Sequence, residues 1–150
     1  MSFRPVVTQI DDRGSVCEMF DPRWGWSHAP LVFTYMFTLR SGRVKGWGMH
    51  KLHEDRYFVQ FGELELVMYD AREDSPTRGL VARVMLTEWN RGLMNIPAGV
   101  WHANYNPGLK DAVVINFPTR PYDHENPDKY RLPPDTDQIP FKFPPHAVGR

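Results

Sequence analysis

The sequence predicts an all-β fold, a barrel or a sandwich of short strands. Aromatic residues make up 13% of the 150 residues, and the chain also contains 14 prolines and 11 glycines. This composition favours pleated strands joined by frequent turns, and no stretch has the apolar periodicity of an amphipathic helix. Strand-like segments recur at regular spacing, as in barrels and sandwiches. At this length we expect one domain, residues 1–150, around a single core.

Nine segments have the apolar or alternating pattern of strands and are bounded by turn residues. They cover residues 6–10, 15–20, 31–40, 56–61, 63–69, 80–86, 93–96, 100–106 and 112–117. Glu and Leu alternate over residues 63–66, which indicates one wet face and one buried face. Residues 31–37 are apolar on both faces. We therefore expect a partner subunit to cover that strand.

The composition changes after Phe117. Eight prolines between residues 118 and 145 exclude regular strands or helices over most of this segment. The same segment contains apolar anchors, namely Tyr122, Tyr130, Leu132, Ile139, Phe141 and Phe143. These are too many for a free linker, so we predict an ordered, proline-rich C-terminal strap across the barrel.

Charge and hydropathy exclude several classes of partner. Eighteen Lys and Arg balance 18 Asp and Glu, so no basic excess favours nucleic acid. The first residues lack the apolar run of a secretory signal, and no window approaches the roughly 18 apolar residues of a membrane span. We expect a cytoplasmic protein that binds neither nucleic acid nor membranes. The single cysteine, Cys17, excludes an internal disulfide and is interpreted as a small buried hydrophobe.

Polar residues concentrate in two segments that can meet inside a small barrel. They are GMHKLHEDRY at residues 48–57 and IPAGVWHAN at residues 96–104. Side chains two apart on a strand share a face, so His53, Asp55 and Tyr57 should point one way. His102 and Asn104 should likewise share a face. If both sets point inward, the barrel contains two histidines, a carboxylate and a phenol, a costly group for packing alone.

Each of these side chains also has a structural interpretation. A single histidine is more often a hydrogen-bonded structural or surface residue than a catalyst, and both interpretations stay open for His53. Glu54 and Asp55 can belong to a solvated charge run. The remaining histidines (His28, His124 and His146) are interpreted as inert, and the tryptophans (Trp24, Trp26, Trp47, Trp89 and Trp101) as core or interface residues.

Several short motifs follow one another in a recognisable order. They are DRGSVCEMF at 12–20, GMH at 48–50, GE at 62–63, YDAR at 69–72, DSPT at 74–77 and IPAGVWH at 96–102. Together they resemble the dTDP-4-dehydrorhamnose 3,5-epimerases, over about residues 11 to 141. The resemblance implies a cupin-type β-barrel (jelly roll), a homodimer, and no metal or other cofactor. It also implies epimerisation of a 4-keto sugar linked to a nucleoside diphosphate, in nucleotide-sugar or surface-polysaccharide biosynthesis.

The resemblance also implies two catalytic residues. His50 matches the base that removes the proton beside the ketone, and an imidazole held by a carboxylate suits that task. Asp135 matches the carboxylate that orients the imidazole, with Asp137 close enough to be an alternative.

Substrate binding is implied at further positions. Arg13 and Glu18 match residues that bind the nucleotide, often from the neighbouring subunit. Val16 replaces the aromatic residue expected between them. His102 matches the second active-site histidine, which contacts the sugar or the diphosphate, and Asn104 shares its predicted face.

Two departures from the family touch the chemistry. Asp55 occupies the position of the lysine that stabilises the enolate oxygen, and Ile115 or Asn116 replaces the general-acid tyrosine. We predict that Tyr57 donates the proton instead. We predict that Lys51 or Arg56 supplies the positive charge that the lysine would have provided to the enolate oxygen.

Two other functions stay open. In metal-dependent cupins a carboxylate ligand occupies the position of Asp55. Together with His102 and either His50 or His53, it could complete a two-histidine, one-carboxylate metal site. The third possibility is a sugar-nucleotide binder that retains the barrel without catalysis, because binding and catalytic residues of a pocket overlap.

Overall fold

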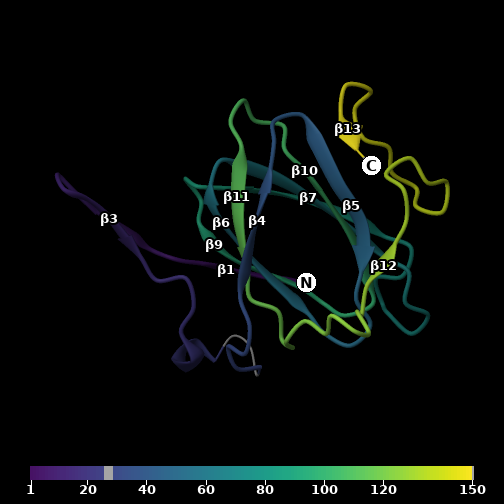
Figure 1. Cartoon of the computed structure of the whole chain (residues 1–150), viewed down its shortest axis with the longest axis horizontal. Coiled ribbons are helices and arrows are strands. Elements are labelled where there is room, and N and C mark those ends of the chain that lie inside the picture. Colours follow the sequence, from purple (N-terminus) through teal and green to yellow (C-terminus); the bar gives the residue numbers. More distant parts are fainter. Residues whose placement is uncertain (26–28, 150) are drawn as a thin grey trace.

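The computed structural model describes residues 1–25 and 29–149, and it has the all-β architecture that the sequence predicts (Figure 1). The strands are β1 (Ser2–Pro5), β2 (Thr8–Asp11), β3 (Gly14–Cys17), β4 (Tyr35–Leu39), β5 (Arg43–Met49), β6 (Asp55–Phe61), β7 (Glu63–Asp70), β8 (Val81–Thr87), β9 (Gly92–Ile96), β10 (Val100–Tyr105), β11 (Ala112–Asn116), β12 (Tyr130–Arg131) and β13 (Val148–Gly149). A 3-10 turn, η1, covers Pro22–Trp24. Within the described ranges, no helix has the length and apolar character needed to cross a bilayer. Trp26 and His28 lie outside the described residues.

Two antiparallel sheets face each other and build the jelly roll (Figure 1). The first has the strand order β1-β9-β6-β11-β4, and the second has the order β12-β5-β10-β7-β8, with β13 parallel to β5. Neighbouring strands in both sheets are often distant in sequence, which confirms the cupin-type barrel. The β2–β3 hairpin belongs to neither sheet and projects away from the barrel.

The core lies between the sheets and follows strand alternation. Leu64, Leu66 and Met68 of β7 are buried there with residues of β6, β9 and β11. This confirms the buried face predicted for residues 63–66. Glu65 points to the other face and is nevertheless buried, because its carboxylate accepts a hydrogen bond from Arg83 Nε at 2.6 Å.

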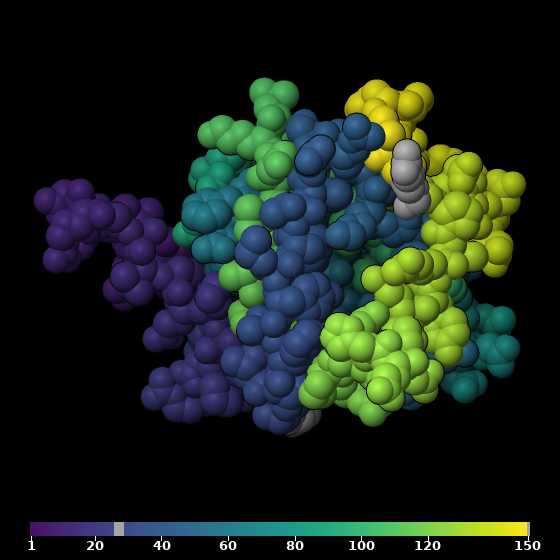
Figure 2. Space-filling model, viewed as in Figure 1, coloured from purple at the N-terminus to yellow at the C-terminus, as the bar shows by residue number. Residues whose placement is uncertain are grey.

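The C-terminal strap covers the outer face of the second sheet, as the apolar anchors predict. Ile139, Phe141 and Phe143 pack around Trp47 of β5. Leu132 exchanges two backbone hydrogen bonds with Trp47, of 2.9 and 3.1 Å. Figure 2 shows the strap, in green to yellow, extending along one side of the molecule. The strap is therefore part of the folded body.

The outer face of the first sheet is covered by the N-terminal segment. Phe20 and Trp24 pack against a buried cluster that contains Phe58 and Phe117. Cys17 joins this cluster while only partly buried, so it is a packing residue as predicted, but a less buried one. Each sheet thus has a second apolar layer outside the barrel core.

Strand β5 lies in a region that the sequence did not mark as a strand. Two glycines interrupt its apolar pattern, and one of them, Gly46, has a φ of 139°. A Cβ on Gly46 would come within 2.7 Å of Ala103 in β10. Only glycine permits this close approach of the two strands.

The loop after β7 is organised by one carboxylate. Asp70 accepts hydrogen bonds from Arg72 Nη2 at 2.7 Å, and from Ser75 Oγ and Thr77 Oγ1 at 2.6 Å each. These contacts, with Arg72 the strongest, hold the pKa of Asp70 well below its usual range although burial opposes them.

We expect Asp70→Asn to lower the free energy of unfolding at pH 7 by about 1–3 kcal/mol. A depressed carboxyl pKa stabilises the fold above the unfolded-state value of 3.8, and this contribution is lost as the pH falls below that value. Urea unfolding at several pH values should therefore show the two proteins converging in acid. A constant difference between pH 7 and pH 2 would contradict this.

Candidate active site

A pocket of about 690 Å³ opens between the two sheets. Its lining residues come from β4 (Tyr35 and Phe37), β5 (Lys45, Gly46, Trp47 and Gly48), β6 (Asp55 and Tyr57), β10 (His102 and Asn104), the β5–β6 loop (His50) and the strap (Lys129, Arg131, Leu132 and Pro133). Strand alternation predicted that Asp55, Tyr57, His102 and Asn104 face inward, and all four line the pocket, whereas His53 is outside its lining.

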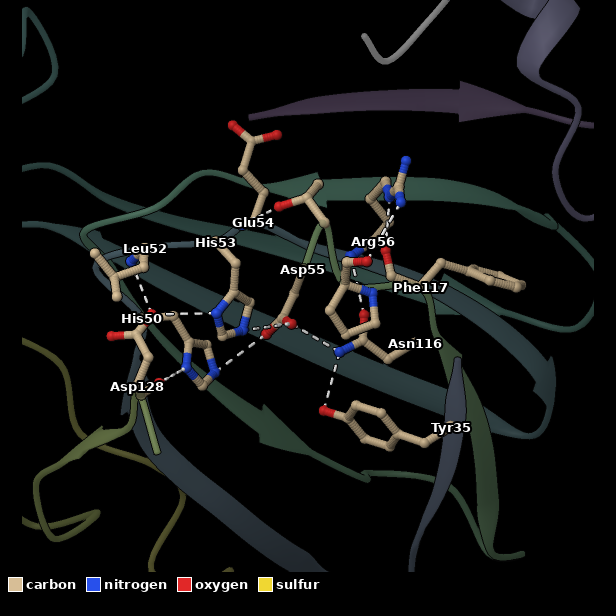
Figure 3. Close-up of polar contacts among 12 residues, drawn as sticks. Tyr35, His50, Leu52, His53, Glu54, Asp55, Arg56, Asn116, Phe117 and Asp128 are labelled. Carbon is tan, nitrogen blue, oxygen red and sulfur yellow. Dashed lines mark hydrogen bonds and ion pairs between the residues drawn. The ribbon is translucent and has the colours of Figure 1, made fainter. Parts of the chain in front are cut away.

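Asp55 is the centre of the pocket floor (Figure 3). It is 2% exposed, and its Oδ2 lies 3.5 Å from Nε2 of His50 and 3.4 Å from Nε2 of His102. Nε2 of His53 lies 3.7 Å from the other carboxylate oxygen, which accepts a 2.7 Å hydrogen bond from Asn116 Nδ2. Burial alone would raise the pKa of Asp55, but His102, His50 and Asn116 together lower it to about 2. Asp55 is therefore a buried carboxylate anion.

Backbone carbonyl groups define the tautomers of two of these histidines. Nδ1 of His50 contacts the carbonyl oxygen of Asp128, and Nδ1 of His102 lies 3.2 Å from the carbonyl oxygen of Val100. A carbonyl oxygen only accepts hydrogen bonds, so we assign the proton of each neutral ring to Nδ1. Each unprotonated Nε2 then lies within 3.5 Å of Asp55 Oδ2, close enough for a bound proton or cation to interact with both. Three proton- or cation-binding atoms thus converge on one point.

The protonation of His50 suits a base. Burial lowers its pKa, and this effect outweighs the opposing charge of Asp55 and the contact with Asp128. The imidazole is therefore neutral at pH 7 and able to accept a proton.

Asp128, in the strap, holds the loop that carries the histidines. Its carboxylate accepts hydrogen bonds from the backbone N–H of Lys51 at 3.0 Å and of Leu52 at 2.7 Å. The same carboxylate lies 3.1 Å from Nδ1 of His53. Together with its carbonyl contact to His50, these bonds fix the position and ring orientation of both histidines.

Asp135, the residue expected to orient His50, is outside the pocket lining. Asp135 is exposed, and its carbonyl oxygen accepts a hydrogen bond from Lys142 Nζ at 3.0 Å. The alternative, Asp137, forms an exposed ion pair with the same lysine. Asp135 and Asp137 follow β12 in the chain, whereas Asp128 precedes β12 by two residues.

Two phenols line the pocket. Tyr57 is 4% exposed and faces the edge of His102, with ring centroids 6.1 Å apart. Burial, and to a smaller extent Asp55, raises its pKa well above the ordinary value. Tyr35 accepts a 3.0 Å hydrogen bond from Asn116, the residue that also holds Asp55 (Figure 3). Burial followed by the charge of Asp55 raises the pKa of Tyr35 to about 12.

The positive charges of the pocket differ from those predicted. Lys51 is exposed, and its Nζ lies 4.5 Å from the ring centroid of Tyr130, outside the pocket lining. Lys45, Lys129 and Arg131 line the pocket instead. The sequence did not single out these three, because they are ordinary surface residues until the strap folds over β5.

Arg56, the other residue predicted to supply positive charge, is outside the pocket lining as well. Its neighbours Asp55 and Tyr57 point inward, so its side chain points to the opposite face, where it is fully buried. The guanidinium donates hydrogen bonds to the carbonyl oxygens of Phe117 at 2.6 Å, Ala29 at 2.8 Å and Pro30 at 3.0 Å. Arg56 therefore ties two loops to the outside of the first sheet.

We expect Arg56→Lys to lower the free energy of unfolding by about 2–4 kcal/mol, because an ammonium cannot reproduce the planar set of donors. The affinity of the folded variant for a pocket ligand should be unchanged. Urea unfolding and a ligand titration on the same preparation measure the two effects. Weaker ligand binding with unchanged stability would restore the substrate-binding role.

Arg13 and Glu18 lie away from the pocket. Arg13, on the exposed turn of the β2–β3 hairpin, pairs with Asp11 at 2.6 Å. Glu18 follows the hairpin and lines a separate hollow of about 300 Å³ with Arg4 and Trp24. Within the described chain, neither residue contributes to the pocket lining.

Comparisons with known proteins place these features in context. No family profile matches the chain. The chain is 33% identical, over 88% of its own length and 85% of the relative's, to a probable low-salt glycan biosynthesis epimerase, Agl13, of Haloferax volcanii. It is 34% identical to the spore coat polysaccharide biosynthesis protein SpsL of Bacillus subtilis, over 68% of each chain. A crystal structure of a dTDP sugar isomerase from Desulfovibrio desulfuricans G20 superposes with a TM-score of 0.87 at 29% identity, covering 94% of this chain and 88% of that one.

Proposed function

Because the chain belongs to the dTDP-sugar epimerase family of cupin proteins, we propose that it epimerises or isomerises a nucleotide-linked 4-keto sugar in glycan or polysaccharide biosynthesis. The observation that carries the proposal is the cluster of His50, Asp55 and His102 on the floor of a pocket with cations at its mouth. The relatives are named for glycan epimerisation and polysaccharide biosynthesis, and the similar structure for a dTDP sugar.

His50 acts as the base in the proposed reaction. Nε2 takes the proton from the carbon beside the carbonyl, and the bonding electron pair moves to the carbonyl oxygen to form an enolate. Asp55, 3.5 Å away, stabilises the imidazolium that forms. The carbonyl of Asp128 keeps the other ring nitrogen protonated. Asp128, in place of Asp135, is therefore the residue that positions the base.

Return of a proton to the opposite face of that carbon completes the epimerisation. Tyr57 was the predicted donor, and its raised pKa keeps it protonated. Tyr35 fits the task better, because it is the more exposed phenol and its oxygen accepts a hydrogen bond from Asn116. The amide can only donate in that contact, so the hydroxyl proton is available to a ligand. We assign proton donation to Tyr35.

A homodimer is part of the proposal. The β2–β3 hairpin projects from the barrel (Figure 1) and exposes Val7, Ile10 and Val16, each by more than two thirds. Monomeric proteins rarely expose such an apolar group, so we propose that it packs on a second copy. We propose that this contact brings Arg13 and Glu18 to the partner's pocket. Light scattering should give the mass of two chains.

Proton exchange tests the function directly. Incubation with dTDP-4-keto-6-deoxyglucose in deuterated water should introduce deuterium at C3 or C5, as followed by proton NMR. Binding of the sugar nucleotide without any exchange would identify the non-catalytic binder instead. If the protein shows neither binding nor exchange, this substrate class is excluded.

A metal-dependent cupin is the second candidate, and one observation favours it. Asp55 Oδ2 is buried and accepts no conventional hydrogen bond from the described residues, while two histidine lone pairs face it. A tetrahedral ion with bonds of about 2.1 Å separates its ligand atoms by about 3.4 Å. The separations of 3.4 and 3.5 Å between Asp55 Oδ2 and the two Nε2 atoms fit that arrangement. His50, Asp55 and His102 therefore fit a divalent ion, which would supply a Lewis acid.

The two candidates differ in metal content. The epimerase proposal expects exchange to survive treatment with a chelator and the purified protein to hold no stoichiometric transition metal. Elemental analysis that finds one Zn, Fe, Mn or Ni per chain, absent from Asp55→Asn, would favour the metal cupin. His53 belongs only to a second possible group, His50, His53 and Asp128, so metal retained in His53→Gln and lost in Asp55→Asn would assign the ion to the first group.

A further inference from the structure

The pocket has an uneven distribution of charge. Three cations, Lys45, Lys129 and Arg131, line it against one carboxylate, Asp55, so the lining carries a net charge of +2 when its histidines are neutral. The three cations are exposed, whereas Asp55 is buried. Positive charge therefore gathers at the mouth of the pocket, while the chain as a whole has no net charge.

The three cations are close enough to affect one another. Burial lowers the pKa of Lys129, and the neighbouring charges of Arg131 and Lys45 lower it further. Such mutual repulsion is unfavourable unless an anion binds among the cations. A doubly charged anion matches the net charge of the pocket lining.

The pocket floor offers the opposite kind of group. Asn104 is 5% exposed, and its Oδ1 has no hydrogen-bond partner among the described residues. Asp55 Oδ2 is also buried without a hydrogen-bond partner among the described residues. Buried acceptors without a donor are costly, and a ligand hydroxyl would satisfy them. The pocket thus suits a ligand with hydroxyl groups at its buried end and a double negative charge at its outer end.

We propose that Lys45, Lys129 and Arg131 bind the diphosphate of a nucleotide sugar, and that Asn104 accepts a hydrogen bond from a hydroxyl of its sugar. This inference rests on the proposed function and adds the orientation of the substrate. The guanidinium of Arg131 can bind two phosphate oxygens at once, and the lysines act as point charges. The sugar then lies beside His50.

The C-terminal strap becomes part of the binding site under this proposal. Lys129 and Arg131 belong to the strap, and β12 pairs Arg131 with Gly48 of β5. Asp128 precedes them and bonds the backbone of the β5–β6 loop. One short segment, residues 128–131, therefore contains the residue that positions the base and two of the phosphate-binding side chains.

Calorimetric titration with dTDP tests the diphosphate site without requiring turnover. Wild type should bind dTDP, and should bind thymidine at least tenfold more weakly. Lys129→Gln and Arg131→Gln should each weaken dTDP binding about tenfold, and the double variant more. Lys110→Gln removes an exposed cation outside the pocket and should leave binding unchanged. Raising the salt concentration should weaken wild type more than the double variant.

Titration with dTDP-glucose tests whether Asn104, on the pocket floor, binds the sugar. Asn104→Ser should bind dTDP as wild type does but lose the additional affinity that the glucose provides. Thermal unfolding confirms that each variant is folded, and Asn104→Ala provides a second substitution. Equal affinity of wild type and both variants for dTDP-glucose would overturn the role of Asn104.

The outcomes separate this inference from the proposed function. If wild type binds no dTDP at millimolar concentration, or if the double variant and Lys45→Gln bind it as tightly as wild type, the diphosphate site is overturned even where proton exchange occurs. If binding depends on the three cations but no 4-keto sugar exchanges a proton, the site stands and the epimerase function fails.

Discussion

The His50→Gln variant should lose at least about 10³-fold of the rate of deuterium exchange beside the carbonyl of the 4-keto sugar. Glutamine keeps a side chain of similar reach but has no nitrogen lone pair that can accept a proton. Among the described residues of the pocket, only His50 and His102 combine an imidazole, a backbone carbonyl oxygen at Nδ1 and a carboxylate within 3.5 Å of Nε2. Proton NMR of the substrate in deuterated water measures the loss.

Two further variants make this result specific. His124→Gln alters an exposed histidine that contacts Tyr122 outside the pocket, and its exchange rate should equal that of wild type. His102→Gln distinguishes the two imidazoles, since only one removes the proton in the proposed reaction. Exchange that survives in His50→Gln but is lost in His102→Gln would transfer the base to His102. Calorimetry with dTDP shows whether binding persists in each variant.

The local part of the site could be predicted from the sequence. Residues two apart on a strand share a face, so Asp55 and Tyr57 on β6, and His102 and Asn104 on β10, were expected to face the same interior. The structure places all four in the pocket lining. The same rule, applied strictly, excludes Arg56, which lies between two inward-facing residues and points outward.

Contacts between distant segments could not be predicted in this way. Asp128 lies 78 residues from His50, and the strap around it has too many prolines for an alternating pattern. Motif order favoured Asp135, but only the pairing of β12 with β5 decides which aspartate reaches the base. Lys45 and Lys129 join the same pocket through that pairing. Strand β5 itself was missed, because glycines needed for close packing on β10 erase its apolar signal.

We propose that Tyr35 takes the role of the tyrosine that the family resemblance leads us to expect at Ile115 or Asn116. Asn116 of β11 is directly opposite Tyr35 of β4, and its amide bridges Tyr35 and Asp55. Neither contact follows from the spacing of residues along one strand.

Tyr35→Phe should lower the turnover of the epimerase by about 10²–10⁴-fold, because the phenol is the assigned proton donor. The substitution removes only the hydroxyl, so dTDP affinity and thermal stability should stay close to those of wild type. In wild type, the pKa of Tyr35, about 12, keeps the phenol protonated between pH 6 and 9. The loss of turnover in Tyr35→Phe should therefore not depend on pH in this range. Product formation followed by NMR provides the rate.

Tyr57→Phe is the matched comparison, since both phenols line the same pocket. If Tyr35 donates the proton, Tyr57→Phe should retain turnover to within about tenfold of wild type, because general acid catalysis is intact. The reverse pattern, with Tyr57→Phe inactive and Tyr35→Phe active, would return the role to Tyr57. Asn116→Leu adds an internal check. It removes the amide that holds both Tyr35 and Asp55, and should therefore impair proton donation together with the alignment of the histidines.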